Sequence, residues 1–186
     1  MKIYIASKSP RRHELLKQLG IEFEIIDVEI DETWDKKENA RDYVTRLALE
    51  KAHAGKEKIN NNDVIVLGAD TAVVLDDIIL GKTENKSEAA DMLKTLSGRT
   101  HHVYSAIALV KNNNEYTAIN ISRVCFKPLT DEEIGQYCAT GEPLGKAGAY
   151  AIQGKAAKFI ERLEGSYSGV MGLPLYETWQ LIQKMK

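Results

Sequence analysis

"DVIVLGADTAVVLDDIILGKT", residues 63–83, is the stretch that decides the fold. Its first half is a run of small and β-branched apolar residues, which is typical of a strand buried on both faces of a sheet. We expect this strand to end at Gly68-Ala69-Asp70 and the chain to turn in a hairpin at Asp76-Asp77. Ligands bind beside strand ends in open α/β sheets, so Asp70 is a candidate functional residue. The alternative is that Asp70 is a turn residue whose side chain only stabilises the backbone.

Strands and helices alternate on both sides of this stretch. The predicted elements are, in order, a strand at 2–6, a helix after Ser9, a kinked strand at 21–30, a helix after Asn39, a helix capped by Ser87, strands at 102–111 and 115–127, a short helix with a Thr130/Glu133 capping box, a glycine-rich loop at 141–154, a strand at 158–165, a loop at 166–174 and a final helix. This order predicts an α/β fold with a mixed sheet, in one domain of residues 1–186.

The bulk composition narrows the class of protein. The chain has 186 residues, 44% of them hydrophobic and 28% charged, and its net charge is −2. These values suit a folded domain and argue against a broad nucleic-acid or anionic-membrane surface. The first apolar run is too short for a secretory leader or a membrane span, and Cys125 and Cys138 lack metal-ligand spacing. We therefore expect a cytoplasmic protein with free thiols, although the sequence leaves a disulfide open.

Two arginines stand at the start of the first predicted helix. Ser9 is a good N-cap and Pro10 suits the first helical position, which places Arg11 and Arg12 in the first turn. Positive charge at this end opposes the helix dipole and costs roughly 0.3–1 kcal/mol per residue when exposed. Together with Ser7 and the free backbone N–H groups, the arginines suit a phosphate site. Surface salt bridges are the alternative explanation for both arginines.

Three lysines add to this positive charge. Lys51 follows Leu47 by four residues and falls on the inward stripe of its helix, where it needs an anion or a route to solvent. Lys82 and Lys146 each follow a glycine, but the GxxxxGK[ST] pattern of a phosphate-binding loop is absent. With two carboxylates, Glu32 and Asp70, the cations suit a metal-bound polyphosphate. The four histidines have no zinc-type spacing, so we expect them to serve on the surface or in packing.

Several motifs in a fixed order are familiar. They are "ASKSPRRHELLKQLG", "DYVTRLALEKA", "VLGADTAVVLD", "LGKT", "MLKTLSGRTHHVYSAIAL", "EPLGKAGAYAIQG" and "GSYSGVMGLPLYET". From the first strand to the last helix, the chain resembles the Maf family of nucleoside triphosphate pyrophosphatases, which is associated with septum formation. The resemblance implies an elongated mixed sheet with two lobes around a central cleft, similar to inosine triphosphate pyrophosphatases. It also implies a homodimer, and hydrolysis between the α and β phosphates with Mg²⁺, Mn²⁺ or Co²⁺.

The resemblance also implies roles for single residues. Asp70 is the expected proton acceptor, and Glu32 is an expected carboxylate of the metal site, which Asp70 shares. From the charges themselves, we further expect cationic side chains to neutralise the β and γ phosphates and two serines to add hydrogen bonds. The expected groups are Lys51, Lys82, Arg12, Lys146, Ser7 and Ser9.

A second set of residues marks the substrate branch of the family. Arg11, Thr71 and Gln153 match the branch that acts on dTTP and UTP, and a glutamine amide can pair with the donor and acceptor edge of uracil or thymine. The chain departs from the family pattern at three positions. Lys8 is often glycine, Thr83 stands where proline is usual, and Gly145 replaces an aspartate.

Two other functions remain as alternatives. One is a non-catalytic regulator of septum formation that binds a nucleotide or a protein. The other is a pyrophosphatase for modified purine triphosphates. In each case we expect no membrane and no stable nucleic-acid partner.

Overall fold

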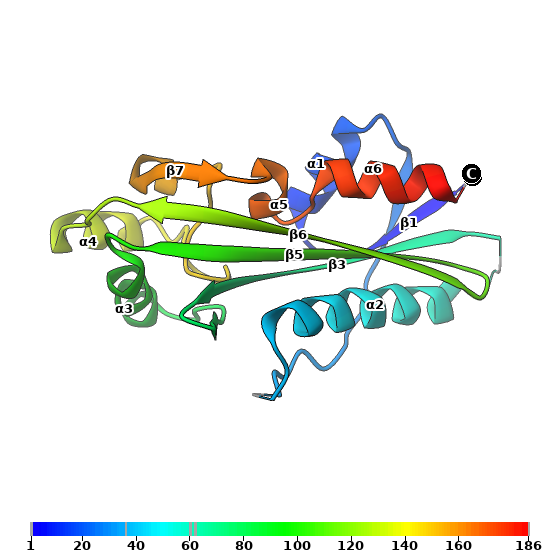
Figure 1. The fold of residues 1–186 in the computed structure, drawn as a ribbon, viewed down its shortest axis with the longest axis horizontal. Coiled ribbons are helices and arrows are strands. Elements are labelled where there is room, and N and C mark those ends of the chain that lie inside the picture. The colour runs from blue at the N-terminus through cyan, green and yellow to red at the C-terminus, as the bar shows by residue number, and fades with distance from the viewer. Residues whose placement is uncertain (1, 36, 60, 62, 186) are drawn as a thin grey trace.

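A seven-stranded mixed sheet forms the centre of the computed structural model, which describes residues 2–35, 37–59, 61 and 63–185. The elements, labelled in Figure 1, are β1 (Ile3–Ala6), α1 (Pro10–Gln18), β2 (Phe23–Ile26), α2 (Ala40–Ile59), β3 (Ile65–Leu75), β4 (Ile78–Leu80), α3 (Lys86–Leu96), β5 (Thr100–Lys111), β6 (Asn114–Phe126), α4 (Asp131–Ala139), the 3₁₀ helix η1 (Lys155–Phe159), β7 (Ile160–Glu164), α5 (Tyr167–Met171) and α6 (Leu175–Lys184).

The strand order is β2-β1-β3-β5-β6-β7, and β4 pairs with the second half of β3. β1 runs parallel to both β2 and β3, whereas every other pairing is antiparallel. The predicted α/β class and mixed sheet are therefore confirmed. No helix among the described residues is long and apolar enough to cross a membrane.

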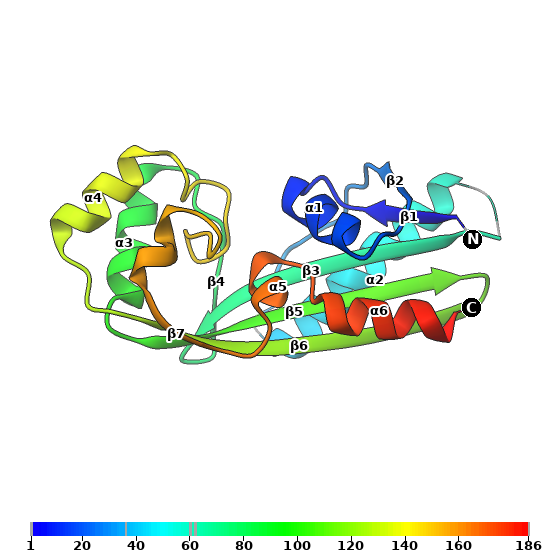
Figure 2. The ribbon, with the colours of Figure 1, turned by 90° about the horizontal axis from the view of Figure 1, so that it is seen from above.

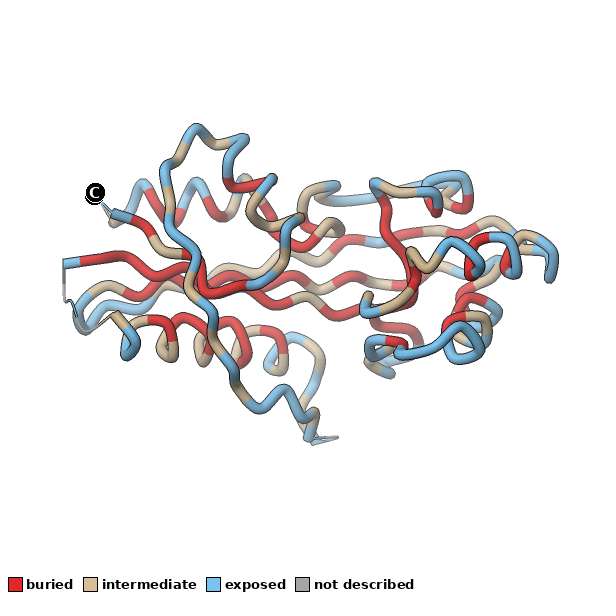
Figure 3. Tube along the Cα trace, turned by 180° about the vertical axis from the view of Figure 1, so that it is seen from behind, coloured by how far each residue is buried: buried red, intermediate tan, exposed pale blue. Residues whose placement is uncertain are grey.

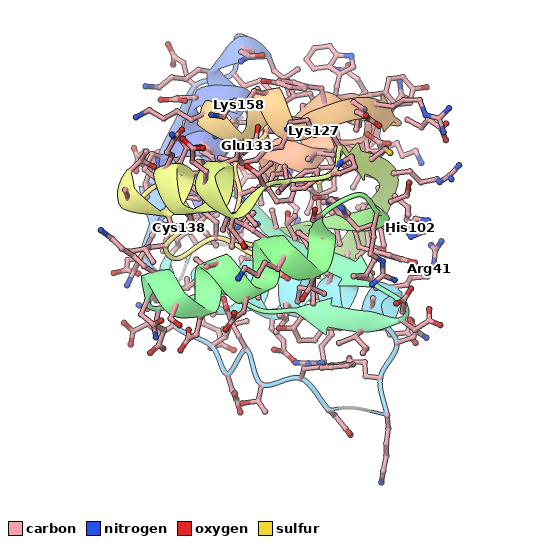
Figure 4. The ribbon with its side chains drawn as sticks, turned by 90° about the vertical axis from the view of Figure 1, so that its left-hand side faces the viewer. Arg41, His102, Lys127, Glu133, Cys138 and Lys158 are labelled. Atoms are coloured by element: carbon pink, nitrogen blue, oxygen red, sulfur yellow. The ribbon has the colours of Figure 1, made fainter. Side chains whose placement is uncertain are left out.

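Three long strands make the molecule elongated. β3, β5 and β6 have 11, 12 and 13 residues and run through both halves of the structure. Figure 2 shows α1, α2 and α6 around one half of these strands and α3, α4 and β7 around the other. Figure 4 looks onto the second half, where Lys127 Nζ lies 2.6 Å from Glu133 Oε1 beside α4. The two expected lobes are thus two ends of one continuous sheet.

Alternation along β3 divides the core of the first lobe into two layers. Ile65 and Leu67 pack with α1 and α6 on one face, while Val66 packs with α2 on the other. A third cluster fills the second lobe between α3 and α4. Buried residues follow the long strands in Figure 3, as expected for a sheet covered on both faces.

β3 does not end at Asp70, which corrects the prediction from the sequence. The strand continues to Leu75 and pairs with β5 from Val66 to Val74. What ends near Asp70 is the neighbouring strand, because β1 pairs with β3 only as far as Gly68. β4 pairs with β3 from Val73 onward. The edge of β3 between these two partners, residues 69–72, is therefore left open.

Local signals predicted most of the other boundaries. Asp76 and Asp77 form the expected turn with φ of 50° and 62°, and the Thr130/Glu133 capping box is present. The Asp42 N–H donates to Asn39 Oδ1 at 3.0 Å, as the predicted cap requires.

Three expectations differ from the structure. The cap of α3 is Asn85 rather than Ser87, since Asn85 Oδ1 accepts the Glu88 N–H at 3.0 Å. The strand expected at 21–30 is confined to β2. The loop expected at 166–174 contains α5, whose N-cap Ser166 accepts the N–H of Gly169.

Candidate functional site

The open edge of β3 lies in a pocket of about 440 Å³ between the two lobes. Its walls come from the β1–α1 turn, the loop after β2, α2, the segment after β4, the 141–154 loop and the end of α5. Every residue predicted for the site from the sequence lines this pocket. They are Ser7, Ser9, Arg11, Arg12, Glu32, Lys51, Asp70, Thr71, Lys82, Lys146 and Gln153.

Asp70 and Thr71 reach the pocket from opposite faces of the sheet. Successive side chains of a strand alternate, so Asp70 points toward α2 and Thr71 toward α1 and α5. The contacts agree, because Asp70 pairs with Lys51 of α2 and Thr71 lies 3.4 Å from Arg12 of α1. Both can line one pocket because, among the described residues, no strand covers this edge of β3 between β1 and β4. The pocket therefore wraps around the edge of the strand.

A chain of alternating charges runs across the pocket. Lys51 Nζ lies 2.7 Å from Asp70 Oδ1 and 2.7 Å from Glu32 Oε1, while Lys82 Nζ lies 3.0 Å from Glu32 Oε2. Burial raises the pKa of Glu32, but the two lysines outweigh it and bring that pKa down to about 2. Lys51 is only 8% exposed, so it is a buried ion-pair partner and does not snorkel to solvent.

Gly68 allows the close approach that forms this chain of charges. A Cβ at Gly68 would lie 2.0 Å from the carbonyl oxygen of Ala48, so only glycine lets α2 rest directly on β3 here. Lys51 follows Ala48 by three residues, and Asp70 follows Gly68 by two on the same face of the strand. The glycine that suggested a strand end is thus explained by helix packing.

The Arg12 guanidinium is fixed by neutral oxygen atoms. Its Nε donates to the Gly172 carbonyl at 2.8 Å, and its terminal nitrogens contact Ser7 Oγ at 3.3 Å and Thr71 Oγ1 at 3.4 Å. Burial lowers the pKa of Arg12, yet a guanidinium keeps its charge at neutral pH. The arginine is therefore held in place, and no carboxylate of the described residues pairs directly with its charge.

Arg11 and Lys146 share that property. Within the described residues, no carboxylate forms an ion pair with Arg11, Arg12 or Lys146. Burial and the charge of Arg11 both lower the pKa of Lys146, whose Nζ donates to the Glu142 carbonyl. Among the described residues, surface salt bridges therefore do not explain why Arg11 and Arg12 lie at the start of α1. The three cations therefore contribute positive charge to the pocket that no ion pair of the described residues offsets.

The loop at 141–154 is tied to the segment after β4. The Gly145 N–H donates to the Thr83 carbonyl at 2.9 Å, and the buried Thr83 hydroxyl donates to the Pro143 carbonyl at 3.3 Å. Lys82 and Ala147 form a β-bridge. Thr83, one of the departures from the family pattern, thus helps to hold Lys82 and Lys146 on the same wall of the pocket.

Ser7 and Ser9 occupy the turn between β1 and α1. Ser9 is the N-cap residue of α1, as predicted, but its side chain makes no capping hydrogen bond. Instead, the Ser9 N–H donates to Ser7 Oγ at 3.2 Å. Lys8, another departure, pairs with Asp27 and Glu29 at the pocket rim.

Two residues of functional interest have no distinct signal in the sequence. Ser105 is 1% exposed and its Oγ lies 2.8 Å from Thr71 Oγ1. Tyr150 lines the pocket, and its hydroxyl lies 2.8 Å from Nε2 of the buried His101. Burial lowers the pKa of His101 to about 4, so this ring is neutral at pH 7. A hydroxyl within the apolar run of β5 was the one available hint for Ser105.

The carboxylates of Asp70 and Glu32 indicate which metal ions could bind in the pocket. No cluster of three or more His, Cys, Asp or Glu with metal-binding geometry occurs in the described part of the chain. The two carboxylates nevertheless converge, since both lie 2.7 Å from the same lysine nitrogen. Oxygen ligands of this kind suit Mg²⁺ or Mn²⁺ when waters and substrate phosphates complete the coordination.

Comparison with known proteins agrees with these motifs. The family described as Maf-like protein matches residues 2–185. A dTTP/UTP pyrophosphatase of Aromatoleum aromaticum is 49% identical over 194 residues, covering 98% of this chain and 94% of the relative. One from Xanthomonas euvesicatoria is 50% identical over 183 residues, covering 97% and 96%.

Solved structures give a more distant match. A dITP/XTP pyrophosphatase from Mycobacterium abscessus aligns with a TM-score of 0.42 and 19% identity, over 69% of this chain and 76% of that one. The family match and the identities near one half, each over nearly the full chain, decide the assignment. This chain belongs to the Maf family.

Proposed function

We propose that this chain hydrolyses dTTP and UTP to the nucleoside monophosphate and pyrophosphate with the help of a divalent cation. One observation carries the proposal. Three cations without acidic partners among the described residues line the same 440 Å³ pocket as a pair of converging carboxylates. A triphosphate is the common ligand that needs both kinds of group, because its terminal phosphates need positive charge and its metal needs oxygen ligands.

The cations are placed to stabilise charge on the phosphates. Arg11, Arg12 and Lys146 all line the pocket, and Lys82 lies at its rim with a side chain 61% exposed. In phosphoryl transfer the enzyme contributes chiefly through positioning and electrostatic stabilisation. We therefore assign Arg12, Lys82 and Lys146 to the β and γ phosphates, with hydrogen bonds from Ser7 and Ser9. An anion bound in the pocket would explain why two arginines lie at the N-terminus of α1, where the helix dipole is already positive.

Asp70 is the proposed general base. Its carboxylate lies on the open edge of β3, where it can accept the proton of a water that attacks the α phosphate. Lys51, at 2.7 Å from Asp70 Oδ1, holds the carboxylate in position and ties it to Glu32. Glu32 and Asp70 would hold the divalent cation, which supplies positive charge to the phosphate oxygens when it is bound.

The nucleobase would be recognised by a second set of residues that line the pocket. The amide N–H of Gln153 can donate to a ring carbonyl of uracil or thymine. Thr71 and Arg11 line the same pocket. The relatives named dTTP/UTP pyrophosphatase, at about half identity over nearly the whole chain, support this choice of substrate. We further propose that residues 1–186 act as one domain, in a cytoplasmic homodimer.

A nucleotide panel tests the proposal. The purified protein is incubated with the common ribo- and deoxyribonucleoside triphosphates and with modified purine triphosphates, each with Mg²⁺, Mn²⁺ or Co²⁺, and the products are separated. We expect dTMP and UMP with pyrophosphate, and no reaction with chelator. Binding without turnover would favour the regulator, and a preference for modified purines would favour the second alternative. Release of orthophosphate from dTTP would reject cleavage between the α and β phosphates.

A further inference from the structure

We infer that Ser105 is a positioning residue that orients the Thr71 hydroxyl, so that Thr71 offers only an acceptor to the nucleotide and thereby selects bases with an imide N–H. The inference rests on the proposed function, since it names how that pocket distinguishes uracil and thymine from cytosine. Ser105 does not line the pocket itself. Its effect passes through Thr71, which does.

The register of the sheet places the two hydroxyls side by side. Thr71 of β3 lies directly opposite Ser105 of β5, and their oxygen atoms are 2.8 Å apart. Ser105 is 1% exposed, and its hydroxyl also lies 2.6 Å from the carbonyl oxygen of Gly169 in α5. Both distances are those of good O–H···O hydrogen bonds. Ser105 therefore contacts two oxygen atoms at once.

Counting protons fixes the direction of these bonds. A serine hydroxyl has one proton, and the Gly169 carbonyl has none to give. The Ser105 proton must go to Gly169, so in the contact with Thr71 it is Thr71 that donates. A contact from Thr71 to the Gly172 carbonyl also exists, but at 3.5 Å it is much longer. The Thr71 proton is thus directed into the protein, toward Ser105.

The Thr71 oxygen then presents lone pairs to the pocket. On the pocket side its protein partner is Arg12, which is itself a donor at 3.4 Å. Phosphate oxygens are acceptors and gain no hydrogen bond from such a group. The imide N3–H of uracil or thymine is a donor and fits it, whereas N3 of cytosine is an acceptor and is repelled. A hydroxyl free to rotate would accept either base, because it can donate or accept.

Dissociation constants of non-hydrolysable nucleotides test this inference separately from turnover. The probes are the α,β-methylene analogues of UTP, CTP, N3-methyl-UTP and 3′-deoxythymidine triphosphate. We expect the wild type to bind the UTP analogue more tightly than the CTP and N3-methyl analogues. Ser105→Ala should reduce each preference roughly three- to tenfold, the range for one net hydrogen bond. The 3′-deoxythymidine analogue should bind about as tightly as the UTP analogue, because the proposed donor to Thr71 is the imide N–H and not a sugar hydroxyl.

Two variants separate positioning from loosening of the fold. Ser122→Ala is the matched control: Ser122 is also 1% exposed and anchors the start of α5 by accepting the Ser166 N–H at 2.9 Å. Its Oγ donates to Asn120 Oδ1 and not to Thr71, so its removal should leave the base preference unchanged. In a Thr71→Val background, Ser105→Ala should have no further effect on preference, because the residue through which it acts is absent.

The outcomes distinguish the two levels of the argument. Equal binding of the UTP and CTP analogues by the wild type would overturn the inference, as would equal shifts in Ser105→Ala and Ser122→Ala. Selectively weaker binding of the 3′-deoxy analogue would also overturn the inference, since Thr71 would then contact the sugar. If Ser105→Ala does not fold, Thr71→Val alone must abolish the preference for the imide. Failure of UTP turnover with a normal binding preference would reject only the proposed hydrolysis.

Discussion

Replacing Lys51 by methionine tests how the buried centre of the site is held together. The side chains of Lys51 and Asp70 are each 10% exposed and pair at 2.7 Å. Methionine keeps most of the volume of lysine but removes the charge, which leaves the Asp70 carboxylate buried without its cation. Loss of one partner of a buried pair costs about 3–5 kcal/mol. That is a large share of the roughly 5–15 kcal/mol by which domains are stable.

Lys82→Met is the matched control, because Lys82 pairs with the same Glu32 from an exposed position. Its side chain is 61% exposed, so its loss should cost about 0–1 kcal/mol. Urea unfolding, followed by fluorescence and far-ultraviolet circular dichroism, gives both free energies of unfolding without metal. Adding Asp70→Asn to Lys51→Met should recover much of the loss, since no buried charge then remains unpaired. Equal losses in Lys51→Met and Lys82→Met would refute the reasoning.

Three further predictions concern pH, packing and specificity. Burial lowers the pKa of His101 from 6.5 to about 4, so the unfolded chain binds more protons than the folded chain between these pH values. The free energy of unfolding should therefore fall as the pH drops through this window, by about 1.4 kcal/mol per pH unit and by up to about 3 kcal/mol in all. His101→Gln should flatten this pH dependence in urea titrations, and an unchanged slope would contradict the prediction. Gly68→Ala places a Cβ 2.0 Å from the Ala48 carbonyl and should cost about 3 kcal/mol or more in thermal and urea unfolding, whereas a neutral effect would mean that α2 does not rest on β3. Gln153→Glu removes an amide donor and should weaken the preference for dTTP and UTP in a nucleotide panel; an unchanged ranking would remove Gln153 from base recognition.

Helical periodicity was enough to identify the inward lysine. Lys51 falls on the stripe of Val44, Leu47 and Ala48, and a buried lysine needs an anion wherever it lies. Two helix caps were equally accessible, since Asn39 and Thr130 use contacts only three residues away, whereas the cap of α3 is Asn85 and not the expected Ser87. Such features depend on near neighbours in the chain, which a single sequence contains.

The pairing of β3 could not be predicted in the same way. Gly68 interrupts the apolar run and suggested a strand end, but the glycine serves the contact with α2. The site opens because β1 stops at Ala6, opposite Gly68, while β4 ends at Leu80, opposite Val73, and each boundary is fixed by pairing with distant residues. Nor does any local pattern mark Ser105, whose contact with Thr71 spans 34 residues of sequence. The short helix α5 was missed for a related reason, since five residues form a stable helix only through tertiary contacts.

The central claim is that Asp70, on the open edge of β3, takes the proton when the triphosphate is cleaved. Pyrophosphate release from dTTP with Mg²⁺ should be measured for Asp70→Asn and for Asp77→Asn. Asp77 lies on the exposed turn of the same hairpin, at φ 62°, a conformation that asparagine tolerates well. We predict a loss of roughly 10²–10⁴ in kcat for Asp70→Asn and wild-type turnover for Asp77→Asn, with both variants folded. A folded Asp70→Asn variant that turns over dTTP at the rate of Asp77→Asn would contradict the account.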